Sequence, residues 1–135
     1  MSENYTRVEQ VMVPEPKTVD GLASVAVAIA IMCEHEISSL VVDRRHEGDE
    51  YGLIVISDIA SQVIARNRAP ERTNVYEIMS KPVLTVDVEM DIKYAIRLLD
   101  RFALSRALVT ERGTLAGIVT LRDMVLRYLG PEAEA

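Results

Sequence analysis

Two residues in the stretch GIVTLRD (residues 117–123) have types and spacing that suit ligand chemistry. The apolar residues predict a strand that ends at Thr120, followed by a helix that carries Asp123 in its first turn. A carboxylate at a helix start can accept two hydrogen bonds from a vicinal diol such as ribose, while the neighbouring hydroxyl and the helix amides face a phosphate. The same T-x-x-D spacing is typical of a helix cap, with Thr120 as the N-cap and Asp123 as the reciprocal group. The ligand-binding role and the helix-capping role require the same geometry, so Thr120 and Asp123 can have both.

The chain repeats this stretch and its surroundings. GLIVISD (residues 52–58) has the same glycine and aspartate, but Val55 stands in the place of the threonine. Three further pairs of segments repeat at a constant offset of 67 residues: VEQVM at 8 and VYEIM at 75, KTVD at 17 and LTVD at 84, ISSLVV at 37 and LSRALV at 104. The glycine stretches are only 65 residues apart, because the hairpin loop before the second one is shorter. The sequence therefore predicts two copies of one fold.

Both copies predict the same order of elements: a short lead-in helix that ends near Met12 or Met79, a short strand, a long helix, a β-hairpin and a closing helix. The fold class is therefore α/β (α+β), with two β-α-β-β-α repeats. The predicted bounds are Leu22–His35 and Asp91–Ala103 for the long helices, Leu40–Asp43 with Tyr51–Ile56 and Arg106–Thr110 with Leu115–Val119 for the hairpins, and Ser57–Arg66 and Leu121–Leu129 for the closing helices.

Copies of about 60 residues bury too little surface to be stable alone, so the two are expected to pack face to face about a pseudo-twofold axis. Residues 1–68 form repeat 1 with its lead-in helix, residues 69–130 form repeat 2, and residues 131–135 form a flexible tail. The segment Leu22–Cys33 is apolar on every side except at Ser24. Such a helix must be covered all round. A second subunit is the favoured cover, and burial within one chain is the alternative.

Composition limits the classes of partner. Of the 135 residues, 49% are hydrophobic, and with no Trp and one Phe the core must be aliphatic. The net charge of −6 argues against nucleic acid as the main partner, because an acidic chain repels phosphate backbones. The longest apolar run, Leu22–Cys33, is well short of the ~20 residues that cross a bilayer, so no membrane partner is expected. The single cysteine, Cys33, is expected to be buried, and the chain to be cytoplasmic.

The ordered motifs VMVPEPKTV, HEISSLVV and GLIVISD in the first copy, and IMSKPVLTV, LSRALV and GIVTLRD in the second, resemble a tandem pair of cystathionine-β-synthase (CBS) domains, the Bateman module. The resemblance covers about residues 8–128. It implies that the chain binds an adenosine ligand in clefts between the copies: AMP, ADP or ATP, with S-adenosylmethionine less favoured. It also implies a homodimer that forms through the helices.

Transferred to this sequence, the resemblance implies one fuller cleft. Asp123 matches the ribose-binding aspartate, Thr120 matches the phosphate-side hydroxyl, and Ile118 would line the base pocket. Arg106 matches a phosphate-binding cation of some relatives; an exposed residue paired with Glu111 or Glu36 is the alternative. The opposite wall would come from the first copy: Pro16, Lys17, Ile37 and Ser38.

The second cleft departs from this pattern. Asp58 is present, but Val55 replaces the hydroxyl, and Leu84 and Ser39 stand where the first cleft has the cations Lys17 and Arg106. Its other wall would come from the second copy: Val83, Leu104 and Ser105. We therefore expect one competent nucleotide site and one that is weak or empty.

The sequence offers no catalytic set and no metal site. His35 and His46 are the only histidines, and neither has cysteine or carboxylate neighbours at metal-ligand spacing. A phosphate loop and a nucleophile elbow are also missing, so no enzymatic activity and no catalytic cofactor are expected. Two hypotheses stay open: a regulatory nucleotide-binding module that an unidentified effector protein reads, and a ligand-independent dimeric scaffold with vestigial clefts.

Overall fold

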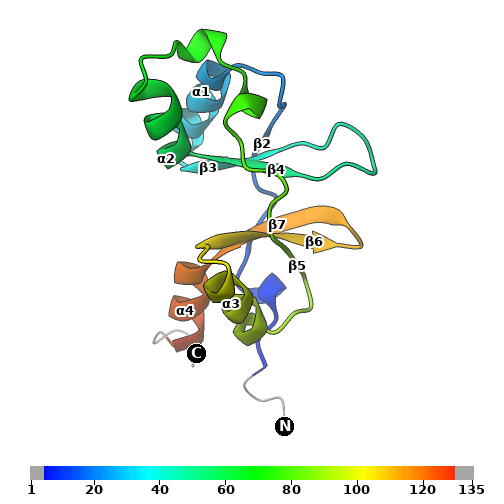
Figure 1. Ribbon diagram of the computed structural model, residues 1–135. Helices are drawn as coiled ribbons and strands as arrows, with labels where there is room; N and C mark the ends of the chain where they lie inside the picture. Colours follow the sequence, from blue (N-terminus) through cyan, green and yellow to red (C-terminus); the bar gives the residue numbers. More distant parts are fainter. Residues whose placement is uncertain (1–4, 130–135) are drawn as a thin grey trace. The chain divides into compact units, whose positions relative to one another are not determined.

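The computed structural model describes residues 5–129, so the tail predicted at 131–135 lies outside the described residues. The chain forms two compact units (Figure 1). Unit 1 contains the N-terminal residues up to Pro16 and the residues from Leu84 onward, and unit 2 contains Lys17–Val83. Each unit combines a small sheet with helices, which confirms the predicted α/β class.

Unit 2 has a three-stranded sheet in the order β2-β3-β4. Strand β2 (Thr18–Val19) is parallel to β3 (Ser39–Val42), and β3 is antiparallel to β4 (Gly52–Val55). The helices are α1 (Val25–His35), α2 (Ile56–Ile59) with a π-helical continuation η2 (Ala60–Ile64), and the 3-10 helices η3 (Pro70–Arg72) and η4 (Val75–Glu77). Its core is aliphatic and consists of Val19, Val25, Ala28, Met32, Leu40, Val42, Ile54, Ile59, Val63, Val75 and Ile78.

Unit 1 has a four-stranded sheet in the order β1-β7-β6-β5. Strands β1 (Val13–Pro14) and β6 (Arg106–Glu111) flank β7 (Thr114–Thr120) in antiparallel pairing, and β5 (Thr85–Asp87) is parallel to β6. The helices are η1 (Val8–Gln10), α3 (Ile92–Arg101) and α4 (Leu121–Leu129). Its core consists of Val8, Val11, Val86, Val88, Ile92, Ala95, Leu99, Ala107, Val109, Val119 and Met124.

The two long helices begin at equivalent caps. Ser24 Oγ accepts a hydrogen bond from the Val27 amide at 3.3 Å, and Asp91 Oδ1 accepts one from the Lys93 amide at 3.0 Å. Helix α1 therefore begins at Val25 and not at Leu22, whose own amide donates to Asp20 Oδ1 in the preceding turn. The predicted start at Leu22 was wrong because the apolar residues Leu22 and Ala23 precede the capping serine and lie outside the helix.

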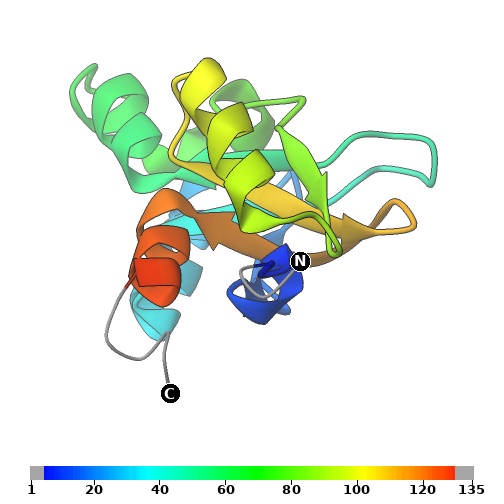
Figure 2. The ribbon, with the colours of Figure 1, turned by 90° about the horizontal axis from the view of Figure 1, so that it is seen from below.

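The lead-in segment of each sequence repeat packs into the unit formed by the other repeat. The amide of Val8 donates to the carbonyl of Met90 at 2.8 Å, and Val75 donates in the same way to Ala23. Both valines are fully buried in the cores they join. In Figures 1 and 2 the N-terminal segment (blue) accordingly lies among the elements of the C-terminal half. Each core is thus built from parts of both sequence repeats.

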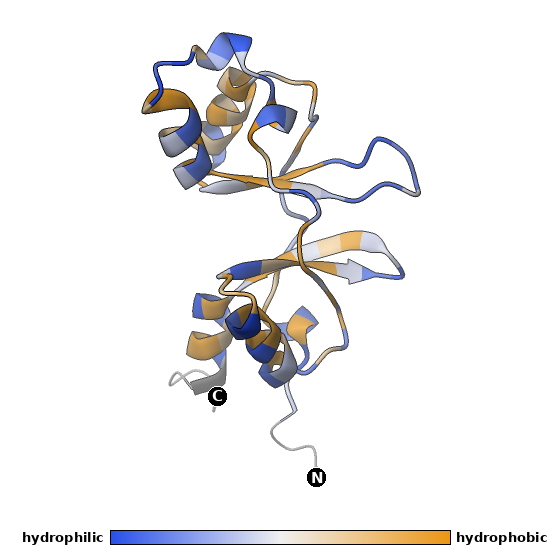
Figure 3. Ribbon diagram, viewed as in Figure 1, coloured by the Kyte–Doolittle hydropathy of each residue, from blue (hydrophilic) through white to orange (hydrophobic). Residues whose placement is uncertain are grey.

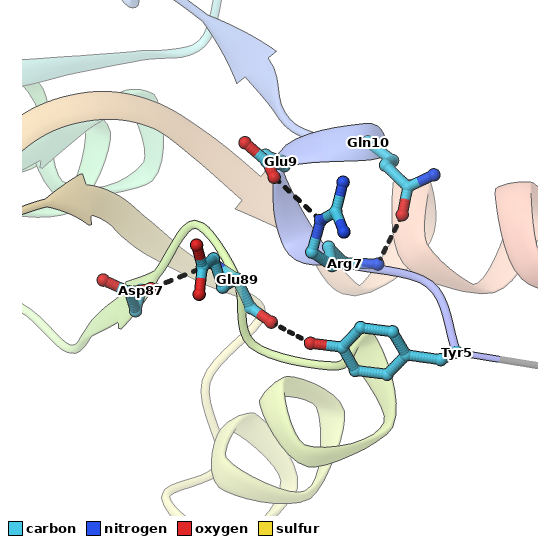
Figure 4. Close-up of polar contacts among 6 residues, drawn as sticks. All are labelled: Tyr5, Arg7, Glu9, Gln10, Asp87 and Glu89. Carbon is cyan, nitrogen blue, oxygen red and sulfur yellow. Dashed lines mark hydrogen bonds and ion pairs between the residues drawn. The ribbon is translucent and has the colours of Figure 1, made fainter. Parts of the chain in front are cut away.

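Polar contacts order the N-terminal segment, and one of them joins it to the rest of unit 1 (Figure 4). The hydroxyl of Tyr5 donates to the carbonyl of Glu89, in the turn before α3. The backbone amide of Arg7 donates to the Gln10 side chain at 2.7 Å, which closes the 3-10 turn, and the Arg7 guanidinium pairs with Glu9 at 2.8 Å. These contacts hold the segment in the position where Val8 reaches the core.

The glycines that begin the two repeated stretches are required by close packing. A Cβ on Gly117 would lie 2.5 Å from Met12 Sδ and 2.8 Å from the Val13 carbonyl oxygen. A Cβ on Gly52 would lie 2.9 Å from Met79 Sδ and 3.2 Å from the Ser80 carbonyl oxygen. In both units a lead-in methionine therefore crosses the strand at the one position without a side chain.

The long hairpin loop of unit 2 is held at its base. Asp49 accepts hydrogen bonds from the Arg45 amide at 3.0 Å and from Lys81 Nζ at 2.9 Å. These donors, the Arg45 amide first, hold the pKa of the Asp49 carboxyl far below its usual range. Arg44 lies over the Tyr51 ring, 4.8 Å from its centroid. Figure 3 shows the loop as a hydrophilic segment, in contrast to the largely hydrophobic α1.

Helix α1 buries only one of its apolar sides. Val25, Ala28 and Met32 enter the core, whereas Val27, Ala30 and Cys33 are exposed. The expectation that Cys33 is buried was therefore wrong, because the cysteine lies on the outer side of the helix. Within residues 5–129, no helix combines the length and the apolar character needed to cross a bilayer.

Gly117→Ala should lower the free energy of unfolding by about 1–3 kcal/mol, because the new methyl group would meet a sulfur atom and a backbone oxygen. Urea unfolding followed by circular dichroism measures the change. Gly48→Ala is the control, since its Cβ would find no atom closer than 3.7 Å. Equal stability of Gly117→Ala and the control would contradict the close packing.

Replacing Asp49 should change how stability depends on pH. Because folding lowers the Asp49 pKa, the carboxylate stabilises the fold above about pH 4, and this stabilisation is lost as the pH falls through the folded-state value. Asp49→Asn should therefore reduce the acid loss of stability between about pH 4 and pH 2. Lys81→Met should raise the Asp49 pKa in an NMR titration without restoring it fully, since the Arg45 amide remains. An unchanged Asp49 pKa in Lys81→Met would refute the ion pair.

Candidate functional site

The end of β7 carries the residues first singled out in the sequence. Thr120 Oγ1 accepts a hydrogen bond from the Asp123 amide at 3.0 Å, so Thr120 caps α4 as predicted. The reciprocal half of the predicted capping box is not formed, since the Asp123 carboxylate has no hydrogen-bond or ion-pair partner among the described residues. Asp123 is half-buried in the first turn of the helix. Its carboxylate is therefore positioned and available to a ligand.

Two further predicted residues lie at this end of the sheet. Arg106 is directly opposite Thr120 in the antiparallel register, and Ile118 precedes Thr120 by two positions on the same face of β7. The neighbouring residues Ala107 and Val119 point the other way and are buried in the core of unit 1. Arg106, Ile118 and Thr120 consequently share the face of the sheet turned away from that core.

Arg106 brings positive charge to this group. It is half-buried, and its guanidinium forms no ion pair with Glu111, Glu36 or any other described residue. The alternative, in which Arg106 is exposed and paired with Glu111 or Glu36, is therefore wrong. A guanidinium, a hydroxyl and a carboxylate at one strand end can bind a molecule that has both a phosphate and a diol.

The equivalent end of unit 2 lacks two of these groups. Val55 is opposite Ser39, and Val55 makes no side-chain cap for α2. Asp58 is half-buried in the first turn of α2, which continues only to Ile59 before the π-helical segment. This end of the sheet therefore offers the Asp58 carboxylate and the Ser39 hydroxyl, but it has no hydroxyl at the cap position and no guanidinium.

The other predicted wall residues are divided between the units. Lys17 and Ser38 are exposed in unit 2; the carbonyl of Lys17 accepts from the Val41 amide at 3.1 Å and that of Ser38 from the Ile56 amide at 2.9 Å. Ile37 is half-buried against the unit 2 core. Pro16 and Val83 are the last residues before the chain passes from one unit to the other, and Leu104 and Ser105 are exposed in unit 1. The assembly of these residues into clefts stays a prediction.

A hollow that was not predicted from the sequence lies at the opposite end of the unit 2 sheet, lined by Gly21, Val42 and Asp43 among others. A signal for it was present in the repeat, since the offset of 67 places Val88 at the position of Gly21. For metals, no group of three or more His, Cys, Asp or Glu side chains within the described part of the chain is placed to hold an ion.

Comparison with known sequences gives a family match over most of the chain. The model of the CBS domain matches residues 8–65 and 75–130. An uncharacterized protein of Methanopyrus kandleri, MK0525, is 36% identical over 103 residues, which cover 74% of this chain and 52% of that protein. An uncharacterized 33.4 kDa protein of Thermofilum pendens is 30% identical over 136 residues, covering 93% of this chain and 44% of that protein. The chain thus spans about half the length of these curated relatives.

Comparison with solved structures gives the same family. The hexameric CBS-CP12 protein from bloom-forming cyanobacteria superposes with a TM-score of 0.84 at 33% identity, over 96% of this chain and 73% of that one. The two matched segments each contain one of the glycine stretches, at residues 52–58 and 117–123. With both the repeats and the fold accounted for, the chain belongs to the CBS domain family, as a pair of CBS domains.

Proposed function

We propose that this CBS pair is a regulatory, non-catalytic module that binds an adenine nucleotide. The observation that supports this most is the unpartnered carboxylate of Asp123, fixed in the first turn of α4 beside the capping hydroxyl of Thr120. A carboxylate in that position accepts both hydroxyls of a ribose, and its unmet hydrogen-bonding capacity favours a ligand over a purely structural role.

The phosphate end of the nucleotide is assigned to Arg106. Its guanidinium is opposite Thr120 and has no ion-pair partner among the described residues, so it can donate two parallel hydrogen bonds to a phosphate. In this proposal Ile118 packs against the base, and the second wall comes from Pro16, Lys17, Ile37 and Ser38. The cations Arg106 and Lys17 favour AMP, ADP or ATP over S-adenosylmethionine, which has no phosphate.

The second cleft is proposed to be weaker. Asp58 remains, with Val83, Leu104 and Ser105 as its other wall, but Val55 cannot donate or accept a hydrogen bond. Binding of about one nucleotide per chain is therefore expected under conditions that saturate the first cleft.

Signalling is proposed to occur through other proteins. Exposed apolar side chains in unit 2, among them Val27 on α1 and Ile64 on η2, favour a homodimer that forms through the helices. The relative CBS-CP12 is hexameric, which supports self-association of this fold. A nucleotide that changes the affinity for an unidentified effector protein must itself bind more tightly when that effector is present. A cytoplasmic location stays a prediction.

Asp123→Asn tests the nucleotide site while keeping the size of the side chain. It should weaken the binding of AMP by about 10- to 100-fold in isothermal titration calorimetry, because hydrogen bonds to a charged group contribute about 1.5–3 kcal/mol. Asp58→Asn, the equivalent change in the weaker cleft, is the matched control and should leave the first binding event unchanged. Arg106→Met should weaken ATP more than adenosine.

Two results would reject this proposal. One is unaltered AMP affinity in Asp123→Asn, and the other is the failure of AMP, ADP and ATP to raise the melting temperature of the wild-type chain. A bound ligand at 100 times its dissociation constant should stabilise the fold by about 2.7 kcal/mol. The second result would favour the alternative, a ligand-independent dimeric scaffold with vestigial clefts.

Val27→Glu tests the homodimer. A carboxylate in the middle of the apolar surface of α1 should weaken self-association by at least about tenfold, because the charge would be buried without a partner. Sedimentation velocity over a concentration series measures this. Glu71→Lys, on the exposed η3 helix of the same unit, is the control. Identical sedimentation of Val27→Glu and wild type would exclude α1 from the interface.

A further inference from the structure

Unit 2 contains a hollow that is separate from the proposed nucleotide site. It has a volume of about 520 Å³ and lies where the parallel strands β2 and β3 end, at Asp20 and Asp43. The end of the sheet that carries Val55 and Asp58 pairs with Ser39, at the opposite end of β3. The length of β3 therefore separates the two places by about 10 Å, at about 3.3 Å per residue.

Gly21, which has no side chain, is one of the residues that line the hollow. A Cβ on Gly21 would lie 3.4 Å from Val42 Cγ1 and 3.7 Å from Tyr76 Cβ, which is ordinary contact, and its backbone does not have a positive φ. Neither close packing nor conformation requires glycine at this position. A larger side chain at this position would occupy part of the hollow, which Gly21 leaves open.

Unit 1 shows what the same fold does without the glycine. The amide of Tyr76 donates to the Gly21 carbonyl at 3.0 Å, and at the equivalent position the amide of Glu9 donates to the Val88 carbonyl at 3.1 Å. Val88 is buried in the core of unit 1. The two units thus share the backbone arrangement, but unit 1 places a valine side chain where unit 2 has none.

The lining combines charges of both signs with an apolar surface. The Asp43 carboxylate and the Arg45 guanidinium have no hydrogen-bond or ion-pair partner among the described residues. Lys81, bound to Asp49, adds a second cation at the rim. Leu22, Val42 and Met79 supply the apolar contacts, together with the ring of Tyr76.

These features are specific to unit 2. The offset of 67 residues places Thr110 at the position of Asp43, Pro14 at that of Lys81 and Glu9 at that of Tyr76. Unit 1 therefore lacks the free carboxylate, the rim cation and the aromatic ring, in addition to having Val88 in place of Gly21. The two units thus differ at four equivalent positions, and all four line the open hollow of unit 2.

We propose that this hollow is a second ligand site, which binds a small zwitterion of the α-amino-acid class with an apolar side chain. The ligand carboxylate pairs with Arg45, its ammonium group with Asp43, and its side chain packs on Leu22 and Met79. A volume of about 520 Å³ is within the roughly 300–1,000 Å³ typical of small-molecule sites. Because the site is open to solvent, the dissociation constant should be on the order of 1 mM.

Titration of the full ¹⁵N-labelled chain with L-leucine, followed by NMR, tests the proposal. The amide signals of Gly21, Asp43 and Lys81 should shift and saturate at about 10 mM ligand. Two leucine analogues, 4-methylpentanoate without the ammonium group and 3-methylbutylamine without the carboxylate, should each bind about tenfold more weakly or not at all.

Three variants make the test specific. Gly21→Val copies unit 1 and should abolish the leucine-dependent shifts, and Asp43→Asn, which leaves the space open, should weaken binding by about tenfold. Arg112→Met, in the hairpin of unit 1, is the control and should bind as the wild type does. Asp123→Asn should also bind leucine normally, which keeps this result independent of the nucleotide site. The proposal is overturned if leucine shifts none of these signals, if both analogues bind as leucine does, or if Gly21→Val leaves the shifts intact.

Discussion

The close contact between a lead-in methionine and a strand glycine occurs once in each unit and helps to join both sequence repeats in one core. Met12 lies where a side chain of Gly117 would be, and Met79 does the same at Gly52. Both contacts join a lead-in segment to the strand of the other sequence repeat. Because β1 is hydrogen-bonded along β7, the segment also aligns the strand that ends at Thr120. The candidate site therefore depends on a packing contact in the middle of its strand, three residues before Thr120.

The order of helices and strands could be predicted because each segment occurs twice in the sequence, so the two copies support the same assignment. The cap at Thr120 was also predictable, since its spacing to Asp123 is local. The exchange of lead-in segments was not, because Val8 and Val75 are apolar in either arrangement and the pattern does not say which core they enter. The assembly of Lys17 or Ser38 with Asp123 has the same limit: local spacing places each residue on its own unit and no further.

The two units show how one backbone acquires different chemistry at its two ends. At one end of the sheet, Thr120 supplies a capping hydroxyl at the helix start in unit 1, whereas Val55 in unit 2 supplies none. At the other end, unit 1 has the buried side chain of Val88 where unit 2 has Gly21 beside an open hollow. The hydroxyl and the guanidinium that a ligand could use are thus on unit 1, and the open hollow is on unit 2.

The shared construction of the two cores affects what happens when the backbone is cut. A protease that cleaves between residues 67 and 74 would produce two pieces, each of which still holds a buried segment of the other's core, through Val8 in one and Val75 in the other. The pieces would remain associated and folded without a peptide bond between them. Such fragment complementation is expected because the two halves are joined by noncovalent packing as well as by the chain.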